Sequence, residues 1–142
     1  MWFVWNGSNW LSAAQYTEPI GYASAQSATG DLTADRLAGD IYAADGLYVE
    51  GWEYSFYVTG GTALSASHKW VVTLKSFVGN VGTARMDVTI DSGASDVWRT
   101  LAGTGGPAVL NGIDMYQVTA TKTGTPGDLH GIGRMTYRRR AT

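Results

Sequence analysis

The sequence contains no cysteine among its 142 residues. This absence excludes a disulfide framework, a cysteine-based zinc site and a thiol nucleophile. A chain of this length is expected to form one domain and to bury roughly 68% of the surface that its unfolded form exposes. Folding therefore requires neither a metal nor a disulfide, and the missing cysteines leave the redox compartment open.

Charged side chains are scarce as well, at 15% of the chain, where a typical soluble domain has about 25%. Ten Lys and Arg against twelve Asp and Glu give a net charge of -2. This balance provides no basic field for a phosphate backbone, so we expect no nucleic-acid partner. A domain with so little charge must present much neutral surface, which favours a protein that belongs to a larger assembly over a free-standing β domain.

No long hydrophobic run is present at the N-terminus. The apolar run Trp2–Trp5 is too short for a signal peptide or a membrane span, and no basic segment precedes it. We therefore expect no membrane partner, and a chain that begins at Met1 and is synthesised in the cytoplasm.

What the sequence does contain is alternation of apolar and polar side chains with a period of two, which is typical of strands with one buried face. Three segments between Leu47 and Ile90 show it most clearly. The residues expected to face the core are Tyr48, Trp52, Tyr54, Phe56 and Val58, then Trp70, Val72 and Leu74, then Met86, Val88 and Ile90. Further strands are expected at Arg36–Tyr42, Val97–Leu101, Ala108–Leu110, Asp114–Lys122 and His130–Arg138.

Many short strands separated by turn signals predict an all-β fold, an antiparallel β-sandwich or jelly roll, over residues 31–142. Residues 1–30 are expected to form an N-terminal β-hairpin and an extended arm. Asn6-Gly7 between two apolar runs is a strong hairpin signal. Because Ala13–Gly30 carries almost no charge, we interpret it as an arm with little regular structure that reaches a neighbour, or else as a loop lying flat on its own domain.

The sequence shows no arrangement that indicates catalysis. His68 and His130 lack a neighbouring nucleophile and carboxylate, and both are expected at the surface or at a strand edge. Asp87, Asp91 and Asp96 match no calcium motif and are interpreted as solvated acids. The carboxylate pair Glu50 and Glu53 is not indicated as a glycosidase site, and the loop Gly103–Pro107 lacks the features of a phosphate loop. We expect no enzyme activity, no catalytic residue, no metal site and no cofactor.

Candidate interface residues are those that the alternation leaves on the outside. Val49, Tyr57, Val71 and Phe77 are expected opposite the core set, where the arm, the hairpin or another subunit covers them. The terminal arginine triplet either contacts an acidic patch of a neighbouring subunit or forms a solvated tail. The predicted interface residues are Trp2, Phe3, Val4, Trp5, Trp10, Tyr57, Val71, Phe77, Arg138, Arg139 and Arg140.

Several stretches resemble structural proteins of tailed bacteriophages. Phe3–Trp10 is similar to the V-W-N-G-S-x-W hairpins of those proteins. Gly46–Gly51 and His68–Leu74 resemble jelly-roll modules of phage virions, as do Lys122–Leu129 and Arg134–Arg138. The resemblance extends over most of Leu32–Arg138 as a pattern.

Such modules occur in capsid decoration (cement) proteins and in tail-fibre heads, usually as trimers, and they carry no catalytic set. Because no fibre shaft precedes the domain, the resemblance implies a decoration protein on the outer surface of the head. It would trimerise and bridge subunits of the major capsid protein. The alternative that it implies is a receptor- or carbohydrate-binding module of a tail fibre or baseplate.

Overall fold

The computed structural model describes residues 2–32, 36–37 and 46–141. The described residues form strands joined by turns, without a helix. The strands are β1 (Phe3–Trp5), β2 (Trp10–Ser12), β3 (Tyr16–Gln26), β4 (Gly30–Asp31), β5 (Arg36–Leu37), β6 (Leu47–Gly61), β7 (Lys69–Val78), β8 (Val81–Ile90), β9 (Arg99–Ala102), β10 (Ala108–Leu110), β11 (Met115–Thr123) and β12 (Pro126–Ala141). Of the strand predicted at Arg36–Tyr42, only Arg36 and Leu37 fall within the described residues.

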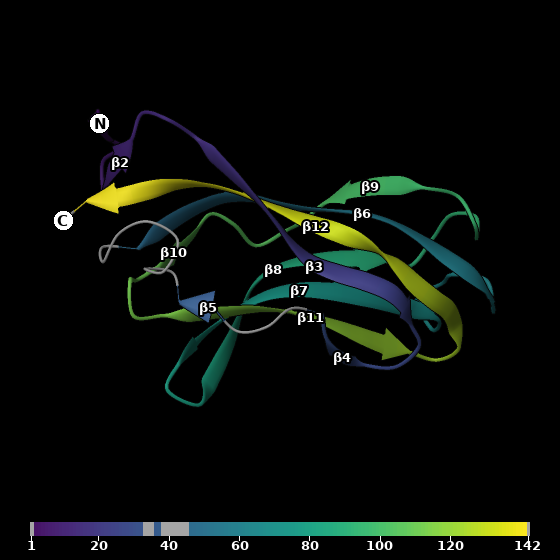
Figure 1. The fold of residues 1–142 in the computed structure, drawn as a ribbon. Helices are drawn as coiled ribbons and strands as arrows, with labels where there is room; N and C mark the ends of the chain where they lie inside the picture. The colour runs from purple at the N-terminus through teal and green to yellow at the C-terminus, as the bar shows by residue number, and fades with distance from the viewer. Residues whose placement is uncertain (1, 33–35, 38–45, 142) are drawn as a thin grey trace.

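All pairings are antiparallel and build two sheets, which Figure 1 shows as two layers. In the first sheet, β12 lies between β6 and the strands β2 and β3, and β6 pairs with β9 and β10 on its other side. In the second sheet, β11 lies between β7 and the short strands β4 and β5, and β7 pairs with β8. The predicted β-sandwich is confirmed.

The connectivity is that of a jelly roll. Taken from β3 onward, the first strand pairs with the last (β3 with β12), and β4 and β5 pair with the next to last, β11. Further inward, β6 pairs with β9 and β10, and β7 pairs with β8. This folding of one long hairpin back on itself is the double Greek key of the jelly roll.

The core consists of the inward side chains of the two sheets. The alternating residues of the three central segments are buried from Trp52 onward, as the periodicity predicts, and so are Tyr116, Val118, Met135 and Tyr137. The indole nitrogen of Trp70 donates to the carbonyl of Gly127 at 2.9 Å, which satisfies this fully buried ring. Burial raises the pKa of the Tyr54 hydroxyl, which donates to the carbonyl of Gly21 at 2.8 Å.

Two predictions about the core are wrong: Val49, expected on the outside, is completely buried, and Tyr48, expected to face the core, is only half-buried. Between the pairs Thr136–Gly51 and Tyr137–Val49, strand β6 contains one more residue than β12. Such a β-bulge reverses the alternation, so Val49 turns inward and Tyr48 turns outward with Glu50. A strict period of two placed both residues on the wrong face.

The segment Ala13–Gly30 is extended, but its interpretation as an arm with little regular structure is wrong. Tyr16–Gln26 forms the eleven-residue strand β3, which pairs with β12 and buries Ile20 and Ala23 in the core. The segment therefore lies against its own sheet. Of the two alternatives that the sequence left open, this is the segment lying on its own domain and not the arm that reaches a neighbour.

Two glycines of β12 make room for large rings of β6. A Cβ on Gly133 would meet Cη2 of Trp52 at 2.0 Å, and one on Gly131 would meet Cε1 of Tyr54 at 2.7 Å. The aromatic side chains of β6 thus lie in space that the glycines of the neighbouring strand leave empty, a close approach that only glycine allows.

Candidate interaction surfaces

The N-terminal hairpin presents a group of exposed large apolar side chains, among them Trp2, the most exposed large apolar residue of the described part of the chain. Strands β1 and β2 form the predicted hairpin, and the carboxamide oxygen of Asn6 accepts hydrogen bonds from the backbone of Ser8 and Asn9 at 3.0 and 2.7 Å. Trp2 is 84% exposed, and Phe3, Val4, Trp5 and Trp10 are exposed as well. The rings of Trp5 and Trp10 lie 5.5 Å apart. The hairpin therefore holds its aromatic side chains together without burying them.

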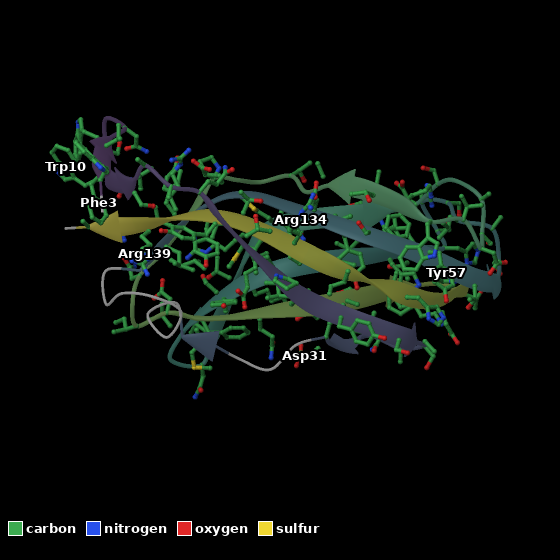
Figure 2. The ribbon with its side chains drawn as sticks, turned by 45° about the horizontal axis from the view of Figure 1, so that its top comes forward. Phe3, Trp10, Asp31, Tyr57, Arg134 and Arg139 are labelled. Carbon is green, nitrogen blue, oxygen red and sulfur yellow. The ribbon has the colours of Figure 1, made fainter. Side chains whose placement is uncertain are left out.

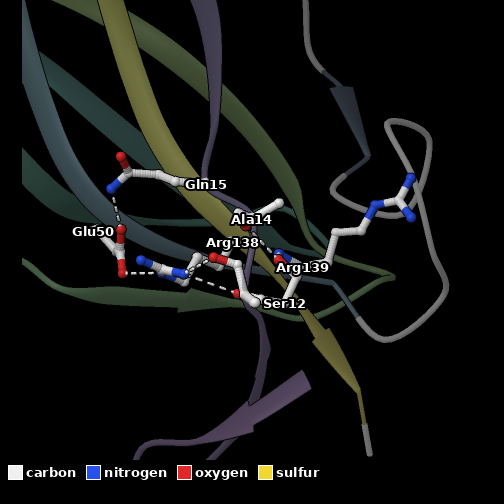
Figure 3. Close-up of polar contacts among 7 residues, drawn as sticks. Ser12, Ala14, Gln15, Glu50, Arg138 and Arg139 are labelled. Atoms are coloured by element: carbon white, nitrogen blue, oxygen red, sulfur yellow. Dashed lines mark hydrogen bonds and ion pairs between the residues drawn. The ribbon is translucent and has the colours of Figure 1, made fainter. Parts of the chain in front are cut away.

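The hairpin is attached to the sandwich mainly through the end of β12. Leu11 and Ser12 are buried, and β2 pairs with Arg140 and Ala141. The Arg138 guanidinium donates to the carbonyls of Ser12 and Ala13 at 3.0 and 2.6 Å (Figure 3). The pairing of β2 with β12 extends the first sheet beyond β3, so the hairpin is a continuation of that sheet.

The three terminal arginines make their contacts within their own chain. Arg138 forms an ion pair with Glu50 at 2.6 Å, and Gln15 also bonds to that carboxylate (Figure 3). The backbone N–H of Arg139 donates to the Ser12 hydroxyl at 3.0 Å, and its guanidinium lies over the ring of Tyr16. The Arg140 guanidinium donates to the carboxamide oxygens of Asn9 and Asn111, both at 3.1 Å. The triplet is half-buried and is not a solvated tail.

A groove beside the hairpin combines apolar and charged walls. It has a volume of about 440 Å³. Its lining residues are Val4, Trp5, Asn6, Leu11, Ser12, Ala13, Tyr48, Glu50 and Arg138. Because Tyr48 turns outward at the bulge of β6, it joins this groove; the sequence offered no signal for that contribution.

The other predicted interface residues lie elsewhere. Val71 and Phe77 are half-buried on β7 of the second sheet, and the Phe77 ring closes against Gly82 of β8. Tyr57 is on the first sheet, and Figure 2 shows it at the opposite end of the molecule from Phe3 and Trp10. The structure thus brings the hairpin and the arginines together and leaves Tyr57, Val71 and Phe77 apart from them.

Tyr57 is half-buried and belongs to a second group of side chains, in which Tyr22 and Trp98 are exposed. Its ring stacks on His130 of β12 with centroids 4.5 Å apart and an interplanar angle of 4°. The Trp98 ring packs against Tyr57 in a T-shaped arrangement, with ring centroids 4.7 Å apart. We call Tyr22, Tyr57, Trp98, His130 and Ile132 the aromatic cluster. Sequence reasoning singled out only Tyr57 as an interface residue, because the cluster is assembled by cross-strand register between four segments that are distant in sequence.

The other polar residues considered as catalytic or metal-binding candidates form ion pairs and hydrogen bonds within the chain. Glu50 and Glu53 are each paired with an arginine, Arg138 and Arg134 respectively. Asp87 accepts a hydrogen bond from the Thr73 hydroxyl at 2.6 Å, and His68 accepts one from the backbone of Thr125 at 2.9 Å. Among the described residues, no three His, Cys, Asp or Glu side chains are grouped as metal ligands would be. The same part of the chain has no helix long and apolar enough to cross a membrane.

Comparison with known proteins shows no family. No protein-family description matches the chain, and no curated protein matches it in sequence. Among solved structures, it is similar to a chain in the structure of the infectious bursal disease virus Gx strain, with a TM-score of 0.42 and 14% sequence identity. That alignment covers 94% of this chain and 38% of the viral chain, so the present chain spans well under half of its length.

Proposed function

We propose that this chain is a non-enzymatic structural protein of a bacteriophage virion, a capsid decoration protein that docks through its N-terminal hairpin. The observation that carries the proposal is the exposure of Trp2, Val4, Trp5 and Trp10 on a hairpin that is firmly bonded to the sandwich. Contiguous exposed apolar surface of this kind marks protein interfaces in soluble proteins. Tryptophan is also the residue type most enriched among the side chains that dominate binding energy.

The attachment of the hairpin favours binding over mere exposure. Because Arg138 and Ser12 tie it to β12, its aromatic side chains are already arranged before a partner arrives. A preorganised surface loses less conformational entropy on binding, so more of the contact energy appears as affinity. In this proposal the partner is the major capsid protein, and copies of the decoration protein meet as trimers through their sandwich domains.

The physical role follows from mass action. A protein that binds the assembled lattice but not loose capsid subunits stabilises the shell in proportion to its occupancy. The outer surface of the head is the location that this role requires, and no chemistry at the site is needed.

The test uses purified heads and the full chain. A variant with Trp2, Trp5 and Trp10 all changed to Ala keeps the buried Leu11 and Ser12 and should fold normally. If only one of the three tryptophans contributes about 2 kcal/mol to binding, the affinity for heads falls by about 30-fold, and it falls further if more of them contribute. The matched control is Trp98→Ala, which removes a tryptophan far from the hairpin whose exposure lies within the range of the three hairpin tryptophans. Full occupancy by the triple variant would overturn the docking role of the hairpin.

A second candidate function is a receptor- or carbohydrate-binding module of a tail fibre or baseplate. It is favoured by a separate observation, the aromatic cluster at the other end of the first sheet, in which Tyr22 and Trp98 are exposed. Immuno-electron microscopy of intact particles separates the two candidates, because it shows whether the protein covers the head or is confined to the tail.

A further inference from the structure

The aromatic cluster forms a row of rings across the outer face of the first sheet. Residue Tyr57 of β6 is the direct cross-strand partner of His130 of β12, and Trp98 precedes β9 on the other side of β6. Cross-strand register therefore sets the order Trp98, Tyr57, His130. Such rows of aromatic neighbours on one face stabilise a sheet, but here the end of the row is open: Trp98 is 62% exposed.

Strand β3 adds the wall of a shallow cavity beside this row. Tyr22 of β3 is 66% exposed and lines the cavity together with Ile132 of β12. The cavity has a volume of about 180 Å³. Pockets for drug-sized ligands begin at about 300 Å³, so this one has room for a single small ring and not for a longer molecule.

The hydrogen-bonding groups around the cavity are available to a ligand. The backbone N–H of Ala25 donates to Nδ1 of His130 at 3.2 Å, and Ala25 has a φ of 52°, a conformation unusual for a residue with a side chain. With Nδ1 as acceptor, the neutral imidazole carries its hydrogen on Nε2. Within the described residues, the hydroxyls of Tyr22 and Tyr57 and the indole N–H of Trp98 make no hydrogen bond to the protein.

We propose that the aromatic cluster binds one pyranose ring of a glycan. A pyranose has an apolar face of C–H groups and a rim of hydroxyls, which matches aromatic walls with donors and acceptors at their edges. No charged side chain lines the cavity, and the chain as a whole is acidic, so a phosphate-bearing ligand is disfavoured. This inference rests on the second candidate function and is independent of hairpin docking.

The experiment titrates the full chain with free glucose, galactose and N-acetylglucosamine and records the tryptophan indole N–H signals by NMR. We expect one or more of these sugars to shift the Trp98 signal and to leave the Trp2 signal in place. Trp98→Ala should weaken binding about tenfold, measured by saturation transfer to the sugar protons. Trp2→Ala, the matched control on the hairpin, should bind as the unchanged chain does.

A third variant separates ring packing from hydrogen bonding. His130→Phe keeps a ring beside Tyr57 but removes the Nε2 donor, and it is expected to weaken sugar binding while the indole spectrum shows an intact fold. Two results would overturn the proposal: no Trp98 response to any of the three sugars, or a Trp98 signal that moves with protein concentration alone, which would make the cluster a contact between copies of the chain. Neither result would affect the binding of the chain to heads, so the two proposals fail separately.

Discussion

The tryptophans of the sandwich and those of the hairpin occupy opposite environments. Trp52 and Trp70 lie between the sheets and are almost completely buried, whereas Trp2, Trp5 and Trp10 are between 47% and 84% exposed. The sandwich is stabilised by packing of its aromatic rings, while the hairpin is joined to the sheet largely through hydrogen bonds of Ser12 and Arg138. The exposed hairpin rings therefore contribute little to folding, which agrees with the role in docking that we propose for them.

The largest effect is expected from removing the same residue type in the two regions. Trp70→Ala deletes a fully buried ring together with its bond to Gly127 and should lower the free energy of unfolding by about 4 kcal/mol. Trp2→Ala deletes an exposed ring and should change it by less than about 0.5 kcal/mol. Urea unfolding followed by circular dichroism measures both values. Equal losses in the two variants would contradict the distinction between the regions.

A smaller effect is expected from adding one methyl group between β12 and β6. Gly133→Ala places a Cβ against the Trp52 ring and should lower the free energy of unfolding by about 2 kcal/mol. The control is Gly51→Ala in β6, where the added Cβ meets no atom within 4 Å. That variant should be close to neutral in the same unfolding experiment. If Gly133→Ala were also neutral, the Trp52 ring would not pack closely against β12 as the structure has it.

The smallest effect is expected from weakening the attachment of the hairpin to the sandwich. Arg138→Ala removes the ion pair with Glu50 and the bonds to the hairpin backbone, and should cost about 1.5 kcal/mol. The matched control Arg134→Ala breaks a more exposed ion pair with Glu53 and should cost at most about 0.5 kcal/mol. Amide hydrogen exchange locates the change: only the Arg138 variant should accelerate exchange at Ser12 and neighbouring residues. Unchanged exchange there would mean that β2 is held without the arginine.

The fold could be predicted because its signal is local. The residues from Trp52 to Val58 and from Trp70 to Leu74 alternate between a buried face and a more accessible face, as the sequence indicates. The exception is Thr73, which is buried although its hydroxyl bonds to Asp87 on the outer face. The pattern failed at Val49, because the bulge depends on the pairing of β6 with a strand that lies about 90 residues further along the chain. It also failed at Tyr16–Gln26. Small residues lie on both faces of this strand, so the sequence shows no clear alternation of apolar and polar side chains there.

The candidate sites were predictable in proportion to how local they are. The hairpin is contained in the short segment Phe3–Ser12, and its turn and apolar strands are visible directly in the sequence. The aromatic cluster combines four segments from Tyr22 to Ile132, and no spacing along the chain indicates that they meet. The arginine triplet was visible as a charge run, but its partners Glu50, Ser12 and Asn9 were not.

By itself, the sequence determined that the chain builds strands with one apolar face and that a tight Asn-Gly turn folds its N-terminus into a hairpin, because side-chain alternation and turn conformation depend on neighbouring residues. Only the tertiary structure decided which strands pair, where β6 bulges and which exposed rings gather at each end of the first sheet. These features arise from contacts between residues far apart in the chain, and such contacts form only when the two sheets close over a common core.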